Sequence, residues 1–295
     1  MTSKDDHWYA KHMATIHAQS PLMIPARFGA WLTDTLASFG MFARFAIATI
    51  GWAILSPSYW LTWRRLAPSL YNVGVLSIPV VAITGMFIGM ILALEGYGQF
   101  ETIGIVERMG GVINASVVKQ IGPVLAAVMV AGRVGGALAA ELGTMRVTEQ
   151  LDAMRAMSVD PIRNLVVPRF MACVLMTPIL TIYSNALGVW GAWIMVVKIY
   201  GVNSADYWHY TGIVVHWWDP VAGLFKSLFF GAAIGLIACW KGFNCAPGAS
   251  GVGRAATAAF VVSFLAIIAI NFVLADFLNE LYYLIFPTGV VSAFA

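Results

Sequence analysis

The sequence predicts an all-α membrane protein in which five helices cross the bilayer. Of its 295 residues, 60% are hydrophobic and only 11% are charged, whereas about a quarter of the residues in soluble domains are charged. Apolar runs such as 73–94 and 255–273 reach the roughly 20 residues that a helix needs to cross the hydrocarbon. Neither run alternates with the two-residue period of a barrel strand. A helical bundle follows.

The chain before the first crossing is predicted to stay on one side of the membrane. Residues 1–23 have no apolar core beside a cleavage site, so they are expected to form a cytosolic tail and not a signal peptide. Three histidines lie in this tail: His7, His12 and His17. Their five-residue steps spread them around a helix, which favours a solvated tail over a metal site. Residues 24–66 are predicted as an interfacial amphipathic helix and linker, since Arg44 would cost a few kcal/mol inside a span. A first crossing here stays an open alternative.

Residues 67–295 are predicted to form the membrane domain. Its crossings are expected at residues 71–94, 121–140, 165–197, 221–240 and 255–278. The third run exceeds one bilayer thickness, so we expect it to tilt or to kink at Pro178. Residues 95–119 are too polar to cross, and residues 201–220 are predicted as a wet, aromatic loop.

The placement of basic residues predicts the orientation. If the N-terminus is cytosolic, only four of the 17 lysines and arginines fall on or toward the far side: Arg108, Lys119, Lys198 and Lys226. The positive-inside rule supports this orientation, with the N-terminus in the cytosol and the C-terminus on the other side of the membrane. The net charge of +3 is small and dispersed, which argues against nucleic-acid binding.

The sequence carries no signature of an enzyme. It contains neither a GxxxxGK[ST] phosphate loop nor HExxH, so we predict that it does not hydrolyse ATP itself and has no catalytic residue, metal or cofactor of its own. Most of its deeply placed acids, such as Glu95 and Asp276, lie near predicted span ends. Proton-driven carriers place acids at mid-membrane, so an ion- or proton-coupled secondary carrier is the weaker alternative. A structural scaffold that binds partners but transports nothing is another.

Pairs of glycines four residues apart recur in the predicted spans. They are Gly85 with Gly89, Gly132 with Gly136, and Gly231 with Gly235. Such pairs let helix backbones approach closely in a membrane. They predict a compact bundle or a dimer.

The polar segment TMRVTEQLDAMRAM, residues 144–157, lies between two very apolar regions. On a helix over residues 146–157, Val147, Leu151 and Met154 form an apolar stripe. A helix this short needs to dock against something. Two interpretations stay open: a helix that rests on the membrane, and a cytosolic coupling helix that fits a groove on a partner. The candidate coupling residues are Arg146, Glu149, Gln150, Asp152, Met154 and Arg155.

The motifs that contain and precede this segment resemble those of the MlaE-type permease family. These motifs are EGYGQF after a GMFIGMILAL span, and GPVLAAVMVAGRVGGALAAELGTMRVTEQLDAMRAMSVDPIRNLVVPR. The family comprises the membrane subunits of MCE-associated lipid ABC transporters. The resemblance covers about residues 70–278, with SLYNVGVLSIP and GLFKSLFFGAAIGLIACWKGFNCAPGASGVGRAAT also in order.

The resemblance implies a homodimeric permease with one interfacial helix and five spans per subunit. It also implies a bacterial inner membrane, with the N-terminus in the cytosol and the C-terminus in the periplasm. It implies two partners, a cytosolic ATPase that binds ATP and Mg and a membrane-anchored periplasmic MCE protein, and it leaves room for a small cytosolic accessory subunit. The substrate would be phospholipid or another apolar lipid, and residues 149–157 would contact the ATPase. Gln120 stands where many relatives have Glu, and Glu95 where several have Gln, so the preferred headgroup stays open.

The resemblance also implies that the first two spans help to form a lipid cavity. The candidate lining residues are Met86, Ile88, Met90, Leu92, Glu95, Val124, Val128 and Val130. The flexible thioether of methionine suits varied acyl chains. Ordinary bundle packing is the alternative for each of these side chains.

Overall fold

The computed structural model describes residues 23–285, and these residues are helical with no strand among them. Six helical stretches are long and apolar enough to cross a membrane: Leu36–Leu55, Trp63–Ile103, Val106–Val147, Ile162–Ile199, Trp218–Phe243 and Ala249–Ile285. The all-α membrane fold is therefore confirmed. Because Leu36–Leu55 also meets these criteria, length and composition do not distinguish an interfacial helix from a crossing there, and the interfacial assignment stays a prediction. The predictions for residues 1–22 and 286–295 lie outside the described residues.

The chain divides into two units, residues 1–48 and 49–295. The helix α2 (Met23–Leu55) begins in the first unit and ends in the second. It is followed by α3 (Pro57–Trp60) and α4 (Trp63–Val73). A 3₁₀ turn, η1 (Val75–Ser77), then leads into α5 (Ile78–Ile103).

The first predicted span, 71–94, is displaced in the structure. The helix breaks between α4 and η1, and α5 begins at Ile78 with Pro79 in its first turn, where the missing N–H costs nothing. It ends at Gly104, whose φ of +76° lies in the left-handed region that glycine adopts freely. Residues 95–103, predicted as too polar to cross, continue the helix.

The second span is a nearly continuous rod. It comprises α6 (Met109–Ser116), η3 (Val117–Ile121), α7 (Gly122–Val130), η4 (Ala131–Gly135) and α8 (Gly136–Val147). The segments η3 and η4 are π-helical turns. The predicted span 121–140 forms the middle of this rod, so the sequence underestimated the length of the helix at both ends.

The rest of the chain continues with α9 (Gln150–Ala156), η5 (Ile162–Val166), α10 (Val167–Trp193), η6 (Ile194–Ile199), α11 (Ser204–Val214), α12 (Trp218–Phe243) and α13 (Ala249–Ile285). The predicted loop 201–220 was wrong, because α11 occupies much of it. Asn203 starts this helix by accepting a hydrogen bond from the Ala205 N–H at 2.9 Å. Tyr207 fixes it to α6, where its buried hydroxyl donates to Asn114 Oδ1 at 3.0 Å.

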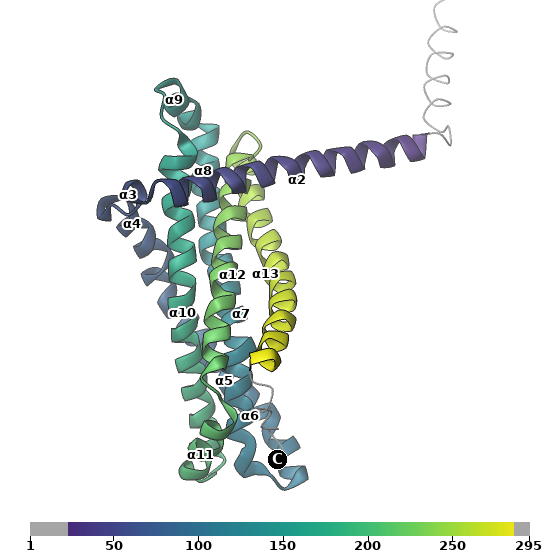
Figure 1. The fold of residues 1–295 in the computed structure, drawn as a ribbon, viewed down its shortest axis with the longest axis vertical. Coiled ribbons are helices and arrows are strands. Elements are labelled where there is room, and N and C mark those ends of the chain that lie inside the picture. Colours follow the sequence, from purple (N-terminus) through teal and green to yellow (C-terminus); the bar gives the residue numbers. More distant parts are fainter. Residues whose placement is uncertain (1–22, 286–295) are drawn as a thin grey trace, which may run out of the picture. The chain divides into compact units, whose positions relative to one another are not determined.

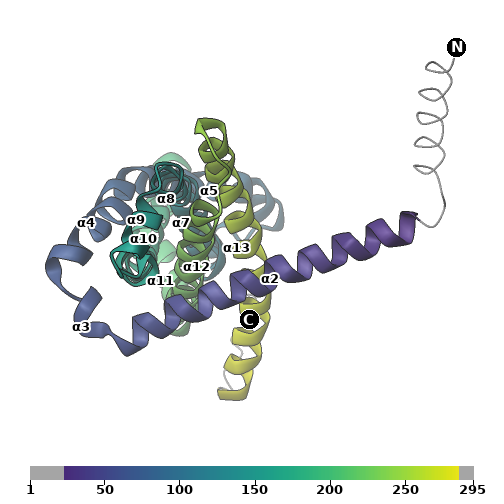
Figure 2. The same ribbon diagram turned by 90° about the horizontal axis from the view of Figure 1, so that it is seen from above.

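The helix α10 lies at the centre of the second unit and contacts α4, α5, α7 and α12. Figure 1 shows α9 at one end of these helices and α11 at the other, and Figure 2 shows α10 between α4 and α12. The core between α7, α10 and α12 includes Ala127, Val130, Leu180, Phe230 and Ile234. This core fixes the positions of α5, α7 and α12, which carry the candidate site described below.

Glycines let α5 and α12 approach α10 closely. A Cβ on Gly89 would lie 1.9 Å from the Gly188 carbonyl oxygen, and one on Gly231 would lie 2.5 Å from that of Cys173. Gly85 and Gly235 face α10 at Ser184 and Phe170. The third predicted pair, Gly132 and Gly136, faces α13 more loosely, with no contact under 3.5 Å. In this chain all three pairs therefore lie at contacts within the bundle.

Candidate functional site

An apolar groove opens between α5, the η3–α7 segment and α13. Its volume is about 460 Å³, and it is lined by Ile88, Ile91, Leu92, Gln120, Ile121, Val124, Leu125 and Asn271. Gln120 and Asn271 are the polar members of this lining. We call this cavity the α5–α13 groove. Its composition suits a long apolar molecule with one polar end.

Three of the predicted cavity residues, Ile88, Leu92 and Val124, line the α5–α13 groove. Met86, Met90 and Val128 are half-buried outside it, and Glu95 is exposed. Val130 is fully buried in the core cluster, so packing is the better interpretation for that side chain. Both spans that were predicted to line a cavity contribute to this groove, but the sequence did not resolve which face of each helix lines it.

A buried lysine lies behind the polar edge of the groove. Lys226 on α12 is only 1% exposed. Its Nζ donates to Gln120 Oε1 at 2.7 Å, to the Lys119 carbonyl oxygen at 2.9 Å and to Asn271 Oδ1 at 3.5 Å. None of the four ion pairs among the described residues involves Lys226. The side chain therefore brings a positive charge to two groove-lining amides without a carboxylate partner from this part of the chain.

The sequence of the second span explains where this lysine binds. Pro123 has no N–H, so it cannot donate to the carbonyl of Lys119 four residues earlier or to that of Val118 five residues earlier. Side chains from other helices donate to both oxygens. Lys226 serves Lys119, and Asn185 Nδ2 donates to the Val118 oxygen at 3.4 Å. A lone lysine in an apolar span was the available sequence signal for this site.

The arginine within the second span has a different environment. Arg133 Nη1 donates to the Asn72 carbonyl oxygen at 2.9 Å and to Ser77 Oγ at 2.8 Å. These acceptors flank the break between α4 and α5, so Arg133 stabilises a helix end. Glu141 pairs instead with Arg169 at 2.5 Å. Each of these two contacts joins one helix to another, which is a structural role.

The polar segment folds differently from the single helix predicted over residues 146–157. Arg146 and Val147 belong to the end of α8, and Glu149 adopts a left-handed conformation with φ of 60°. The helix α9 then covers only Gln150–Ala156. It ends before Ser158, which is also left-handed. Two left-handed residues thus enclose a seven-residue helix.

The charged groups of α9 are partly engaged within the chain. Asp152 accepts hydrogen bonds from Arg146 at 3.1 Å and from Arg155 at 2.9 Å. The Leu151 side chain is buried, and Met154 is half-buried, so this side holds α9 to the protein. Glu149 and Gln150 are exposed. The segment therefore exposes polar side chains while Leu151 anchors it to the rest of the protein.

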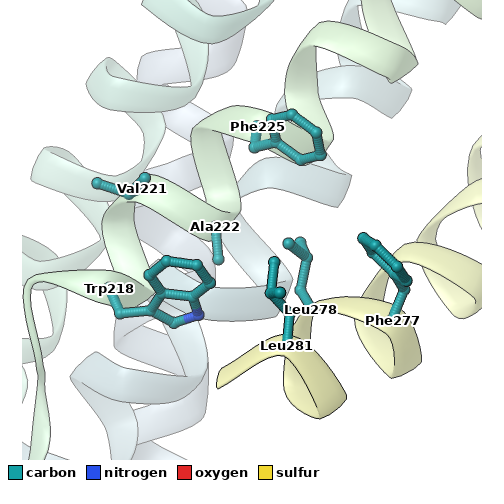
Figure 3. Close-up of a pocket in the computed structure, with 7 residues that line it drawn as sticks. All are labelled: Trp218, Val221, Ala222, Phe225, Phe277, Leu278 and Leu281. Carbon is teal, nitrogen blue, oxygen red and sulfur yellow. The ribbon is translucent and has the colours of Figure 1, made fainter. Parts of the chain in front are cut away.

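A second cavity lies where α12 begins and α13 ends. It has a volume of about 180 Å³ and is lined by Trp218, Val221, Ala222, Phe225, Phe277, Leu278 and Leu281, whose side chains surround it in Figure 3. The lining is aliphatic and aromatic, with no charged side chain. It offers nothing to orient a polar headgroup, and the α5–α13 groove is the stronger candidate. No group of metal-ligating side chains occurs among residues 23–285.

Comparisons with known proteins agree on one family. The family described as "Permease MlaE" matches residues 66–277. A probable ABC transporter permease protein of Rickettsia bellii is 38% identical over 239 residues, which cover 81% of this chain and 91% of the relative. One from Synechocystis is 44% identical over 72% of this chain and 80% of its own length. The intermembrane phospholipid transport system permease protein MlaE of Haemophilus influenzae is 34% identical over 80% of this chain and 91% of its own.

Proposed function

The chain belongs to the MlaE permease family, and from that premise we propose that it moves phospholipid or a similar apolar lipid between the inner membrane and a periplasmic MCE protein. It is a multi-pass membrane permease without an ATP site of its own. A separate cytosolic ATPase drives it, and two copies of the chain form the transport unit. The name of the Haemophilus relative supports phospholipid as the substrate class.

The observation that carries this proposal is the pairing of the α5–α13 groove with Lys226. Aliphatic side chains of α5 and α7 line most of the groove. Acyl chains that move into it from the bilayer interior therefore stay in an apolar environment. Gln120 and Asn271 mark its polar edge, and the lysine behind them has amide and carbonyl partners only. A phosphodiester at this edge supplies the negative charge that would offset the buried cation.

The segment around α9 is the proposed contact with the ATPase. Its exposed face carries Glu149 and Gln150, whereas Leu151 holds it to the rest of the chain. Reversing the charges of Glu149 and Asp152 should weaken ATPase association or uncouple hydrolysis from lipid movement, with membrane insertion unchanged. Unaltered association and unaltered lipid-stimulated ATP turnover would contradict this role.

Crosslinking tests the groove directly. Irradiation after extraction into detergent should give a phospholipid adduct from a photoreactive residue at Leu92, because the groove retains its lipid. The same residue at Phe272, which is 77% exposed on α13, should give no phospholipid adduct, because detergent has replaced the bulk lipid there. A photoreactive residue at the core position Val130 should give none. Equal labelling at Leu92 and Val130 would refute the groove as a lipid site.

Copurification tests the wider assignment. When the chain is expressed with its genomic neighbours and purified in mild detergent, native mass spectrometry should find two copies with an ATPase, an MCE protein and phospholipid. A chain that emerges alone and lipid-free, yet moves a solute in liposomes, would instead support the secondary carrier. A chain that binds partners but moves no lipid would support the scaffold.

A further inference from the structure

A second group of basic side chains lies near the α9 end of the bundle, away from the groove. Arg65 on α4 and Arg163 in η5 both lie over the ring of Tyr59 on α3, with guanidinium carbons 3.7 and 4.2 Å from its centroid. Arg163 also lies 4.9 Å from the centroid of a Trp52 ring. Aromatic faces attract guanidinium groups at these distances. We call these four residues the arginine–tyrosine cluster.

The arginine–tyrosine cluster is held in place by its surroundings. The Tyr59 hydroxyl donates to Asn164 Oδ1, and Asn164 Nδ2 donates to the Asp160 carbonyl oxygen at 3.2 Å. Beside it, Trp60 Nε1 donates to the Ala53 carbonyl oxygen at 2.8 Å, in a small core shared with Leu66 and Phe170. The two guanidinium groups are therefore positioned before any ligand arrives, which lowers the entropic cost of binding.

Both arginines lack an acceptor from the described chain. The side chains of Arg65 and Arg163 form no ion pair or hydrogen bond with residues 23–285. The Nε atom of Arg163 is buried without a partner, which leaves its terminal nitrogens as the accessible donors. Two like charges beside one ring repel each other. An anion between them would remove this repulsion, and the planar donor fork of arginine matches phosphate oxygens.

The surface beside these charges is apolar. Leu55, Leu61 and Trp63 are 79%, 60% and 76% exposed. Exposed leucine and tryptophan next to arginine is typical of the interface between membrane and water, where basic pockets bind lipid headgroups. An anionic lipid satisfies both parts of this surface, since its phosphate reaches the arginines and its chains cover the apolar residues. An acidic protein surface would satisfy only the first part.

We propose that the arginine–tyrosine cluster binds the phosphate of an anionic phospholipid in the membrane leaflet on the α9 side. This lipid is resident and is not transported, and the site is separate from the α5–α13 groove. The cluster joins η5, which follows α9 in the chain, to the end of α2 and to α3. A bound headgroup would therefore stabilise the junction of these three elements.

The test measures lipid binding by the full-length chain purified in detergent. Phosphatidylglycerol, phosphatidylcholine and inorganic phosphate are titrated separately, and the Tm and the number of retained lipids by native mass spectrometry are recorded. Phosphatidylglycerol should raise the Tm at lower concentration than the other two. Arg65→Gln with Arg163→Gln should lose one retained phosphatidylglycerol and weaken its binding by about fivefold per arginine, or about 25-fold together.

The matched control is Arg64→Gln, since Arg64 is exposed, is next to Arg65 and contacts no aromatic ring among residues 23–285. It should bind phosphatidylglycerol as the native chain does. Arg65→Gln alone changes an exposed side chain and keeps the test available if the double variant does not fold. Unchanged phosphatidylglycerol binding in folded Arg65→Gln would overturn the proposal.

Three other results would also overturn it. Arg64→Gln could weaken binding equally, which would mean that the attraction is not localised. Inorganic phosphate could raise the Tm as effectively as the lipid, which would identify a site for a free anion. The double variant could keep its phosphatidylglycerol but lose a copurifying protein, which would identify a protein-docking surface.

Discussion

The helices α12 and α13 are neighbours and both are strongly apolar, but they differ in how much of their surface is buried in the protein. In the most apolar windows, mean hydropathy is 1.9 for α12 and 2.6 for α13, yet 56% of the first window and only 17% of the second are buried. The helix α12 is packed against α10 through Gly231 and Gly235. The helix α13 contributes Asn271 to the groove. Hydropathy thus predicts that a helix enters the membrane but not whether protein or lipid surrounds it.

The largest effect is expected where α12 meets α10. In Gly231→Ala, the new Cβ would lie 2.5 Å from the Cys173 carbonyl oxygen and 2.8 Å from Thr177 Oγ1. Because backbone must move to admit it, we expect a loss of about 2–3 kcal/mol. Thermal unfolding in detergent should show a lower Tm and a lower yield of folded protein. A native Tm would mean that this contact is looser than the structure indicates.

The next effect is expected from Lys226→Met on the same helix. It leaves the Lys119 carbonyl without a donor, which costs about 1–3 kcal/mol for a buried group, and it removes the charge behind the groove. Retention of phospholipid should fall by more than about tenfold. Adding Pro123→Ala restores a backbone N–H and should recover stability but not lipid retention. Recovery of both stability and lipid retention would mean that Lys226 is not required for lipid binding.

A smaller change in stability is expected on α13. Asn271→Leu removes one long hydrogen bond of 3.5 Å and fills part of the groove, so it should cost less than about 1 kcal/mol. Lipid retention and the Leu92 adduct should nevertheless decrease clearly. If Asn271→Leu instead destabilised the protein strongly and left the Leu92 adduct unchanged, α13 would serve mainly the fold and not lipid binding.

The smallest effect is expected from Gly253→Ala, the α13 counterpart of Gly231→Ala. Nothing lies within 4 Å of the added Cβ, and alanine favours a helix over glycine by up to about 1 kcal/mol. The Tm should stay the same or rise slightly in the same unfolding assay. A large decrease would show that a partner covers this face, as the proposed homodimer would.

The sequence predicted the all-α membrane fold because that fold depends on apolar length. It misplaced local features that depend on tertiary contact. The helix α11 was missed because its stability comes from burial of Tyr207 against α6. The break after Val147 was missed because left-handed residues such as Glu149 carry no glycine signal.

The site was predictable only in part. Ile88, Leu92 and Val124 were identified because their spans carry the family resemblance. Lys226 was noticed as an ionisable residue in a span, but its partners come from η3 and α13, far away in sequence. No local pattern relates these segments. The arginine–tyrosine cluster escaped prediction for the same reason, since α3 and η5 meet only in the folded chain.

The missing N–H of Pro123 has a consequence for how this protein diversifies. The proline lacks the one N–H that could have served the Val118 or the Lys119 carbonyl, and these two oxygens accept from Asn185 and Lys226, on two other helices. These three positions should therefore covary during descent, so that lineages that lose the proline are freed to lose Asn185. Lys226 should be retained after the proline is lost wherever the transported lipid is anionic. A survey of related sequences can thus distinguish inherited architecture from selection by the substrate.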